Sequence, residues 1–448
     1  MKITGKCILI LVLLFCIFSS SCRDSKIDEE IVKNADNLDT VLGMDTRDSL
    51  EEYFDGFTPE TKYIPGAKTD LEGIYSPIYT IDNNKFYFPV RKRYETANSL
   101  GGIGIYSYVD LQTGDHHLIC SDPLCKHIYE QCKYVDMTGA IFFAEPNVLY
   151  IEFVNWSIYR SEIYKVDLNA DTIRSVYRCE DDITKQYAMI LFIKRNKLYF
   201  SVTTNIESDE NDSEKMNTQV STLKIMDLSN GQIIESKDFP TDYVETGAFC
   251  SIIYIDGDTY YFSSLRDIFT ANSNFKKQKT IYSFGPNEHM SIYYYDEKTK
   301  KLFFLVRNDK QMTGSVYVYA NGELNELDMP HENIYSFQLT NNKIYYSPYD
   351  PVFLGVSPRD SDVYNYTGGK IYATDRNSRK ESELVFDNGE KLLFGTDSLD
   401  YVIIGDYIYF PYMHFMDDGT FVWFSSALDL KQGRINLKEN TIKYFGFE

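Results

Sequence analysis

Asn341-Asn342-Lys343-Ile344-Tyr345-Tyr346 is the clearest copy of a unit that recurs along this chain, a tight polar turn followed by a short aromatic and β-branched run. Six further runs follow similar turns: Phe86-Tyr87-Phe88, Leu149-Tyr150-Ile151, Leu198-Tyr199-Phe200, Tyr260-Tyr261-Phe262, Leu302-Phe303-Phe304 and Ile408-Tyr409-Phe410. The starts of successive runs lie 63, 49, 62, 42, 42 and 64 residues apart. One hairpin per roughly 40 to 60 residues is typical of the blades of a β-propeller.

The composition agrees with a strand-rich repeat. Apolar residues make up 43% of the 448 residues, with 38 Tyr and 29 Phe, and such side chains suit sheets that are covered on both faces. We therefore predict an all-β fold, a seven-bladed β-propeller of four-stranded antiparallel blades. A two-sheet sandwich with a second domain is the alternative, and six or eight blades remain open if blade four or blade seven is divided differently.

Each repeat divides into four short strands. In blade one the predicted strands are 74–81, 86–90, 104–111 and 116–120, and in blade seven they are 401–405, 407–412, 421–430 and 434–438. Three of the third strands end in the same pair, and this repetition supports the register: Asp110-Leu111, Asp167-Leu168 and Asp227-Leu228.

The antiparallel order predicts two different faces. Connections from first to second and from third to fourth strands share one face, the turn face. Second-to-third connections and blade crossovers share the other, the long-loop face, which holds the long segments Arg91 to Gly102, Thr203 to Val220 and Pro348 to Gly369. Because binding residues concentrate on long loops carried by a rigid scaffold, we expect the long-loop face to be the working face.

The first 22 residues have the pattern of an export signal. Lys2 and Lys6 precede an apolar run from Ile8 to Phe18, and small residues lead to Cys22. This pattern resembles the lipobox of bacterial lipoproteins, which implies cleavage before Cys22 and attachment of diacylglycerol to its sulfur. Ser19 stands where the lipobox usually has Leu, and an ordinary secretory peptide is the alternative.

The next segment is acidic. Arg23 to Phe57 holds eleven Asp or Glu against four Lys or Arg, so we predict that residues 23–70 form a flexible tether and that residues 71–448 form the propeller. Lipidation of Cys22 would place the protein on the extracellular face of the bacterial cell membrane, with the bilayer as a partner. The net charge of −21 argues against nucleic acid, because a phosphate backbone needs a concentrated basic face.

Three of the eight cysteines crowd into one predicted crossover between blades one and two, at Cys120, Cys125 and Cys132. With His127 between them, they could close a tetrahedral shell around a structural zinc ion. A closed shell leaves no position for substrate, so a catalytic metal is disfavoured. His116 or His117 could replace Cys132 as a ligand.

Disulfide bonds are the alternative for these cysteines, since they are natural outside the membrane. Once the signal segment and Cys22 are set aside, the cysteines are odd in number, so at least one thiol remains unless a metal or another chain takes it: Cys120, Cys125, Cys132, Cys179 and Cys250.

The hairpin repeat and the Cys-Asp-Pro-x-Cys-x-His segment together resemble the propeller lipoproteins of gut Firmicutes, which carry TolB-like repeats. That resemblance implies a propeller over roughly residues 70 to 448 and a surface location. The Ser-Pro-Asp-Gly turn of TolB, the WD dipeptide and the aspartate box of sialidases are missing from the sequence, so no named activity is implied.

The sequence favours a binding module over an enzyme without deciding between them. Trp156, Tyr412 and His414 fall at the start of second-to-third loops, where aromatic side chains could contact a glycan or peptide, although packing is the simpler reading. A hydrolase or lyase acting on glycans is the second hypothesis, and a structural partner in a surface complex is the third. The sequence contains no Gly-x-Ser-x-Gly elbow and no His-Glu-x-x-His motif.

Overall fold

The structure is a computed structural model, and it describes fourteen segments of the chain: residues 74–75, 81–82, 84–95, 100–122, 124–125, 132–134, 141–155, 159–206, 218–239, 251–356, 362–367, 369–385, 401–412 and 431–445. The predicted signal, Cys22 and the predicted tether lie outside these residues. Within the described segments, no helix is long and apolar enough to cross a membrane.

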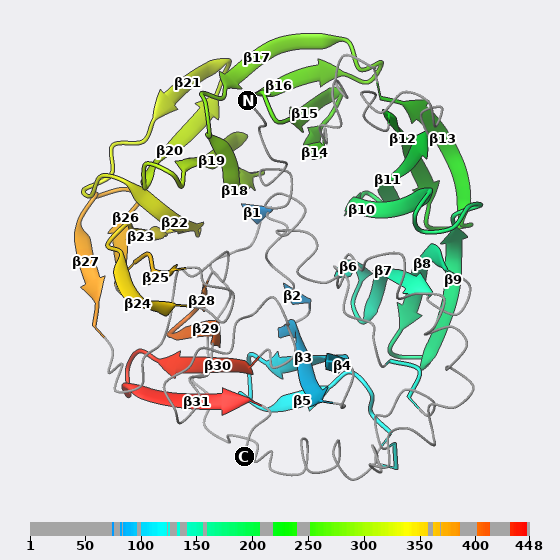
Figure 1. Ribbon diagram of the computed structural model, residues 1–448, viewed down its shortest axis with the longest axis horizontal. Helices are drawn as coiled ribbons and strands as arrows, with labels where there is room; N and C mark the ends of the chain where they lie inside the picture. Colours follow the sequence, from blue (N-terminus) through cyan, green and yellow to red (C-terminus); the bar gives the residue numbers. More distant parts are fainter. Residues whose placement is uncertain are drawn as a thin grey trace.

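The described strands form seven four-stranded antiparallel blades arranged in a ring, so the predicted propeller and its blade number are confirmed (Figure 1). Blade one holds β2 (Ile81–Asp82), β3 (Lys85–Glu95), β4 (Leu100–Asp110) and β5 (His116–Leu118), and blade two holds β6 (Ile141–Glu145), β7 (Val148–Asn155), β8 (Arg160–Asp167) and β9 (Thr172–Arg178). Blade three holds β10 (Gln186–Lys194), β11 (Lys197–Ile206), β12 (Thr218–Asp227) and β13 (Gln232–Asp238), and blade four holds β14 (Ser251–Asp256), β15 (Thr259–Ser263), β16 (Asp267–Asn272) and β17 (Lys277–Ser283).

The remaining blades follow the same order along the chain. Blade five holds β18 (His289–Asp296), β19 (Lys301–Asn308), β20 (Thr313–Ala320) and β21 (Glu323–Glu326), and blade six holds β22 (Ile334–Leu339), β23 (Lys343–Pro348), β26 (Ile371–Asp375) and β27 (Glu381–Leu384). Blade six also carries a separate hairpin, β24 (Val352–Val356) with β25 (Asp362–Asn365), and blade seven holds β28 (Val402–Ile404), β29 (Tyr407–Tyr412), β30 (Lys431–Asn436) and β31 (Thr441–Phe445).

An aspartate fixes the turn from third to fourth strand in several blades. The Oδ1 atom of Asp110 accepts hydrogen bonds from two turn amides, at 2.7 and 3.1 Å, and that of Asp167 accepts two at 3.0 Å. Asp227 does the same for the amide of Ser229 at 2.8 Å. The repeated Asp-Leu ending seen in the sequence is therefore a turn-capping device, since an Asp side chain can replace a missing backbone partner.

The prediction that the first strand of blade one is a single strand is wrong. Instead of one strand over 74–81, β1 (Ile74–Tyr75) pairs with β18 at the inner edge of blade five, and only β2 belongs to blade one. Ile74 lies opposite Asp296, at the turn-face end of β18. The inner edge of β18 offers unpaired backbone groups, and the N-terminal segment covers part of that edge.

The predicted last two strands of blade seven are also wrong. The third strand is β30, not 421–430, and the fourth is β31, not 434–438. The polar sequence of β30 is accommodated because the buried Arg434 guanidinium lies 4.5 Å from the centre of the Tyr407 ring, a cation–π contact. Residues 421–430, rich in aromatic side chains, lie outside the described part of the chain.

Ring closure rests on side-chain packing. Blades one and seven each come from one continuous segment, and no strand is exchanged between them in the described part of the chain. A single hydrophobic cluster joins Phe86 of blade one to Val402 and Tyr409 of blade seven. Since burial of apolar surface is the main favourable term available at this seam, the cluster is what closes the ring.

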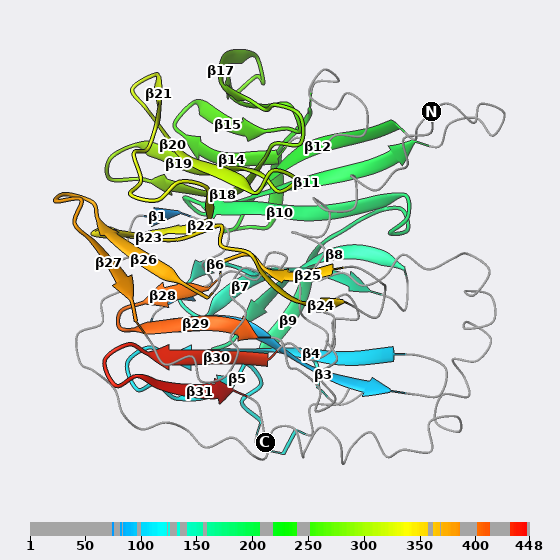
Figure 2. The ribbon, with the colours of Figure 1, turned by 60° about the vertical axis from the view of Figure 1, so that its left-hand side comes forward.

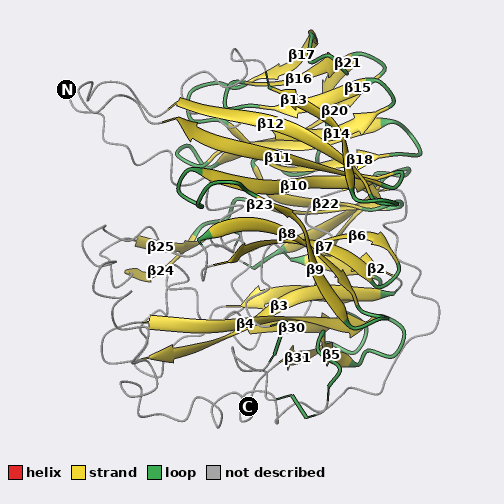
Figure 3. Ribbon diagram, turned by 90° about the vertical axis from the view of Figure 1, so that its right-hand side faces the viewer, coloured by secondary structure: helices red, strands yellow, loops and turns green. Residues whose placement is uncertain are grey.

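The two faces differ as expected. The segment 91–102, predicted as a loop, is instead mostly strand, because β3 and β4 continue their pairing as far as Glu95 and Leu100. The β3–β4, β11–β12 and β24–β25 hairpins all extend to the same side of the ring (Figures 2 and 3). The long-loop face therefore carries three projecting hairpins on a rigid scaffold.

Candidate metal centre

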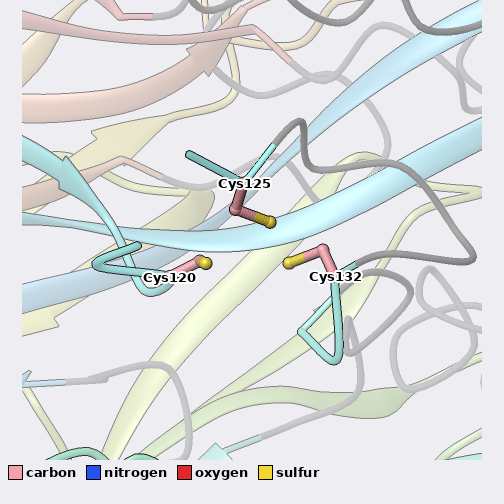
Figure 4. Close-up of side chains that lie close together, drawn as sticks. All are labelled: Cys120, Cys125 and Cys132. Atoms are coloured by element: carbon pink, nitrogen blue, oxygen red, sulfur yellow. The ribbon is translucent and has the colours of Figure 1, made fainter. Parts of the chain in front are cut away.

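The three clustered cysteines follow the outermost strand of blade one. The chain leaves β5 at Leu118, reaches Cys120 and Cys125, and returns at Cys132 before blade two begins. The sulfur atoms of these three residues lie within 4.8 Å of one another (Figure 4). This spacing allows one metal ion to contact all three sulfurs.

A tight turn brings the first two cysteines together. The Cys125 amide donates to the Asp122 carbonyl oxygen at 3.1 Å, and the Leu124 amide donates to the Asp122 carboxylate at 2.9 Å. Asp122 therefore begins a hydrogen-bonded turn, and this turn places Cys125 close to Cys120.

Two of the sulfurs accept hydrogen bonds from the backbone. The peptide N–H of Asp122 donates to the Cys120 sulfur, and the N–H of Tyr134 donates to the Cys132 sulfur. In each case the donor lies two residues after the cysteine, so the local turn aims the amide at the sulfur. Such bonds favour the thiolate over the thiol, and the thiolate is the form that binds metals.

The second end of the segment is anchored to blade two. The buried Tyr134 hydroxyl donates to Asp171 Oδ1 at 2.7 Å, and Lys133 Nζ lies 2.7 Å from Asp171 Oδ2. Asp171 belongs to the turn between β8 and β9 and has a positive φ of 51°. Sequence reasoning missed this anchor, since nothing in the sequence connects residues 37 positions apart.

Without a cation, the cluster opposes ionisation. Burial raises the pKa of Cys132 well above its usual range, with the neighbouring sulfurs adding to the effect, and burial likewise raises the pKa of Cys120. A dication among the sulfurs would reverse this balance, because a coordinating thiol is deprotonated outright. Three soft thiolate donors fit Zn²⁺ or another thiophilic ion better than Mg²⁺, Ca²⁺ or Mn²⁺.

The other predicted site residues are distributed differently. Most of them lie outside the described part of the chain, namely His127, Trp156 and His414, and the same holds for Cys250. Tyr412 is described and is the last residue of β29, opposite Lys431. Within the described segments, no second group of His, Cys, Asp or Glu side chains lies close enough together to hold a metal ion.

The histidines next to the cluster pack against aromatic rings. His116 is buried and stacks on Phe88, with ring centres 5.6 Å apart, while His117 lies against Tyr108 at 5.2 Å. Neither histidine belongs to the group formed by the three described sulfurs. A role for His116 or His117 in place of Cys132 therefore finds no support in the described geometry.

The described cysteines carry free thiols. Cys179 is fully buried in the core between blades two and three, apart from the cluster, and burial raises the pKa of its thiol to about 11. Its sulfur lies in this core and accepts a hydrogen bond from the Ser161 hydroxyl.

The fold and the cluster together define a seven-bladed β-propeller with a three-thiol site that could hold a metal ion. No model of a known protein family matches the sequence, and no curated protein sequence matches it.

Solved structures with a similar fold include an oligogalacturonate lyase in complex with manganese (11% identity, TM-score 0.44, 74% of this chain and 95% of that chain covered). They also include an acylaminoacyl peptidase (13% identity, TM-score 0.41, 79% of this chain and 60% of that chain covered). A third is the β-propeller domain of the Trilobed protease from Pyrococcus furiosus (10% identity, TM-score 0.42, 83% of this chain and 97% of that chain covered).

Proposed function

We propose that this protein is a lipid-anchored extracellular binding propeller that presents its long-loop face to a glycan, peptide or protein, with a structural zinc site between blades one and two. The observation that carries the proposal is the grouping of the β3–β4, β11–β12 and β24–β25 hairpins on one face of a rigid ring.

The path of the chain supports an arrangement in which the long-loop face points away from the membrane. Ile74, the first described residue, lies opposite Asp296, whose side chain caps the turn-face connection between β18 and β19. A tether over residues 23–70, joined to lipid at Cys22, would have a root-mean-square length of about 40 Å as a random coil. A chain that joins the propeller at the turn face leaves the opposite face free to point away from the membrane.

Exposed apolar side chains mark one part of the long-loop face. Val352 and Phe353 on β24 are 47% and 54% exposed, respectively. Aromatic side chains at such positions are well suited to contact a sugar ring or a partner protein. Ile234 on β13, 47% exposed, is a comparable apolar residue on the outermost strand of a different blade and provides a control.

Binding to immobilised glycans and peptides, followed by product analysis, tests the proposal. We expect Phe353→Ser to weaken binding of any ligand found, and Ile234→Ser to leave it unchanged. Equal loss in both variants contradicts the assignment of the working face. Product formation from a bound glycan would instead support a glycan-active hydrolase or lyase.

The zinc site has a structural role in this proposal. Cys120, Cys125 and Cys132, with His127 as the fourth ligand, would tie the crossover to the core between the first two blades. Metal analysis with thiol titration tests this part. About one zinc per chain and no disulfide is the expected result, whereas a metal-free protein with disulfide-bonded Cys120, Cys125 or Cys132 contradicts it.

A further inference from the structure

A separate cavity lies where blades four and five meet, at the turn face. Its volume is about 410 Å³, within the range of small-molecule sites. Residues of both blades line it, from the turn after β14 to the hairpin between β20 and β21. Figure 1 shows these two blades as neighbours in the ring. It lies on the face opposite to the projecting hairpins, so it is independent of the function proposed above.

The inner wall of this cavity is a fixed polar network. Lys300 Nζ lies 2.9 Å from Asp256 Oδ1, and the Tyr295 hydroxyl donates to Asp256 Oδ2 at 2.9 Å. Burial alone would raise the pKa of Asp256, but these two hydrogen bonds outweigh it and hold the pKa below its usual range. Asp256 is therefore ionised, and Lys300 compensates its charge.

A second lysine lines the cavity without such compensation. The Lys279 ammonium group donates to the Gly322 carbonyl oxygen and lies 5.7 Å from the centre of the Tyr319 ring. Among the described residues, no carboxylate lies within ion-pair distance of it. The cavity thus carries a local excess of one positive charge on a protein whose net charge is −21.

The rest of the lining suits a hydroxylated ring. Tyr261 and the largely buried Tyr319 meet edge to face with ring centres 6.5 Å apart, and both line the cavity. Hydroxyl and amide groups complete the lining, and these belong to Thr259, Thr270, Gln278 and Asn321. Aromatic faces pack against the C–H groups of a sugar, while hydroxyl and amide groups hydrogen-bond its hydroxyls.

We infer that this cavity binds a sugar acid, with the carboxylate of the ligand placed against Lys279 and its ring against the tyrosines. The ligand carboxylate neutralises the one cavity charge that the described residues leave without a carboxylate partner. Charge-assisted hydrogen bonds of this kind are roughly twice as strong as neutral ones.

Ligand-observed NMR and calorimetry on the full chain test this site with two matched probes, glucuronate and methyl glucoside, and with acetate as a third. We expect glucuronate to bind more tightly than either of the others and to bind less tightly at high ionic strength. Lys279→Gln should weaken glucuronate binding about tenfold.

Lys310→Gln provides the matched control. Lys310 is exposed in the connection between β19 and β20, on the long-loop face, so the variant removes the same charge from the far side of the molecule. It should leave glucuronate binding within about twofold of wild type. Absence of glucuronate binding, equal binding by Lys279→Gln and wild type, or methyl glucoside or acetate binding as tightly as glucuronate would each overturn the assignment.

Discussion

Closure of the ring depends on side chains, and this predicts a measurable coupling between Phe86 and Tyr409. Their ring centres lie 5.0 Å apart across the seam between blades one and seven, and the residues are only 6% and 3% exposed. We expect Phe86→Leu and Tyr409→Leu each to lower the free energy of unfolding by about 1 to 2 kcal/mol, because each loses ring contacts while keeping an apolar side chain.

The double variant should lose less than the sum of the two single variants. Paired aromatic rings contribute about 0.5 to 1.5 kcal/mol beyond their buried area, so we expect a coupling energy of about 1 kcal/mol. Equilibrium urea unfolding of the four proteins, followed by circular dichroism, measures it.

A second cycle provides the control. Phe239 stacks on Phe275 with ring centres 5.2 Å apart, in the core between blades three and four, away from the seam. Phe86→Leu combined with Phe239→Leu should be additive within about 0.5 kcal/mol. If the coupling between Phe86 and Tyr409 is as small as in this control, their packing does not hold the seam and ring closure depends on other contacts.

Three further predictions concern two titratable side chains and the metal site. Burial, followed by His117 and Lys443, lowers the pKa of His116 to about 3, so the folded protein keeps His116 neutral while the unfolded chain protonates it. The free energy of unfolding therefore decreases as pH falls from about 6.5 towards 3. Between pH 7 and about pH 4.5, urea unfolding should show a decrease that is about 2 to 3 kcal/mol smaller for His116→Gln than for wild type. Burial raises the pKa of Glu152 to about 8 despite a hydrogen bond from the Ile190 amide. The contribution of Glu152 to the free energy of unfolding therefore falls by about 1 kcal/mol for each unit that the pH rises between about 4.5 and 8. Glu152→Gln should flatten this part of the stability profile, and an unchanged slope would contradict the assignment. A chelator should lower the melting temperature of wild type but not that of Cys132→Ser. Cys179→Ser is the control and should respond to the chelator as wild type does. Thermal unfolding with and without zinc measures both effects.

The sequence predicts the parts of the fold that are encoded locally. A turn followed by an aromatic-rich strand needs only neighbouring residues, as at Gly257, whose φ of +60° suits glycine in the tight connection between β14 and β15. The sequence also predicts the cluster of Cys120, Cys125 and Cys132, because the three residues lie within thirteen positions and the turn at Asp122 folds them together.

Pairing over long distances is not visible in the sequence. Ile74 pairs with Asp296, 222 positions away, and no local pattern distinguishes that partner from the adjacent blade. The third strand of blade seven is misplaced by sequence reasoning because its polar residues, among them the buried Arg434, suit a core only when the Tyr407 ring lies beneath the guanidinium.

What the sequence alone determined is therefore the repeating hairpin, the all-β class and the group of thiols, all set by contacts between near neighbours. Only the tertiary structure decided how the ring closes, which blade receives β1, and that Lys279 and Asp256 line one cavity. Those features depend on how whole blades pack against one another, and the energy of that packing comes from surfaces that no single segment of the chain contains.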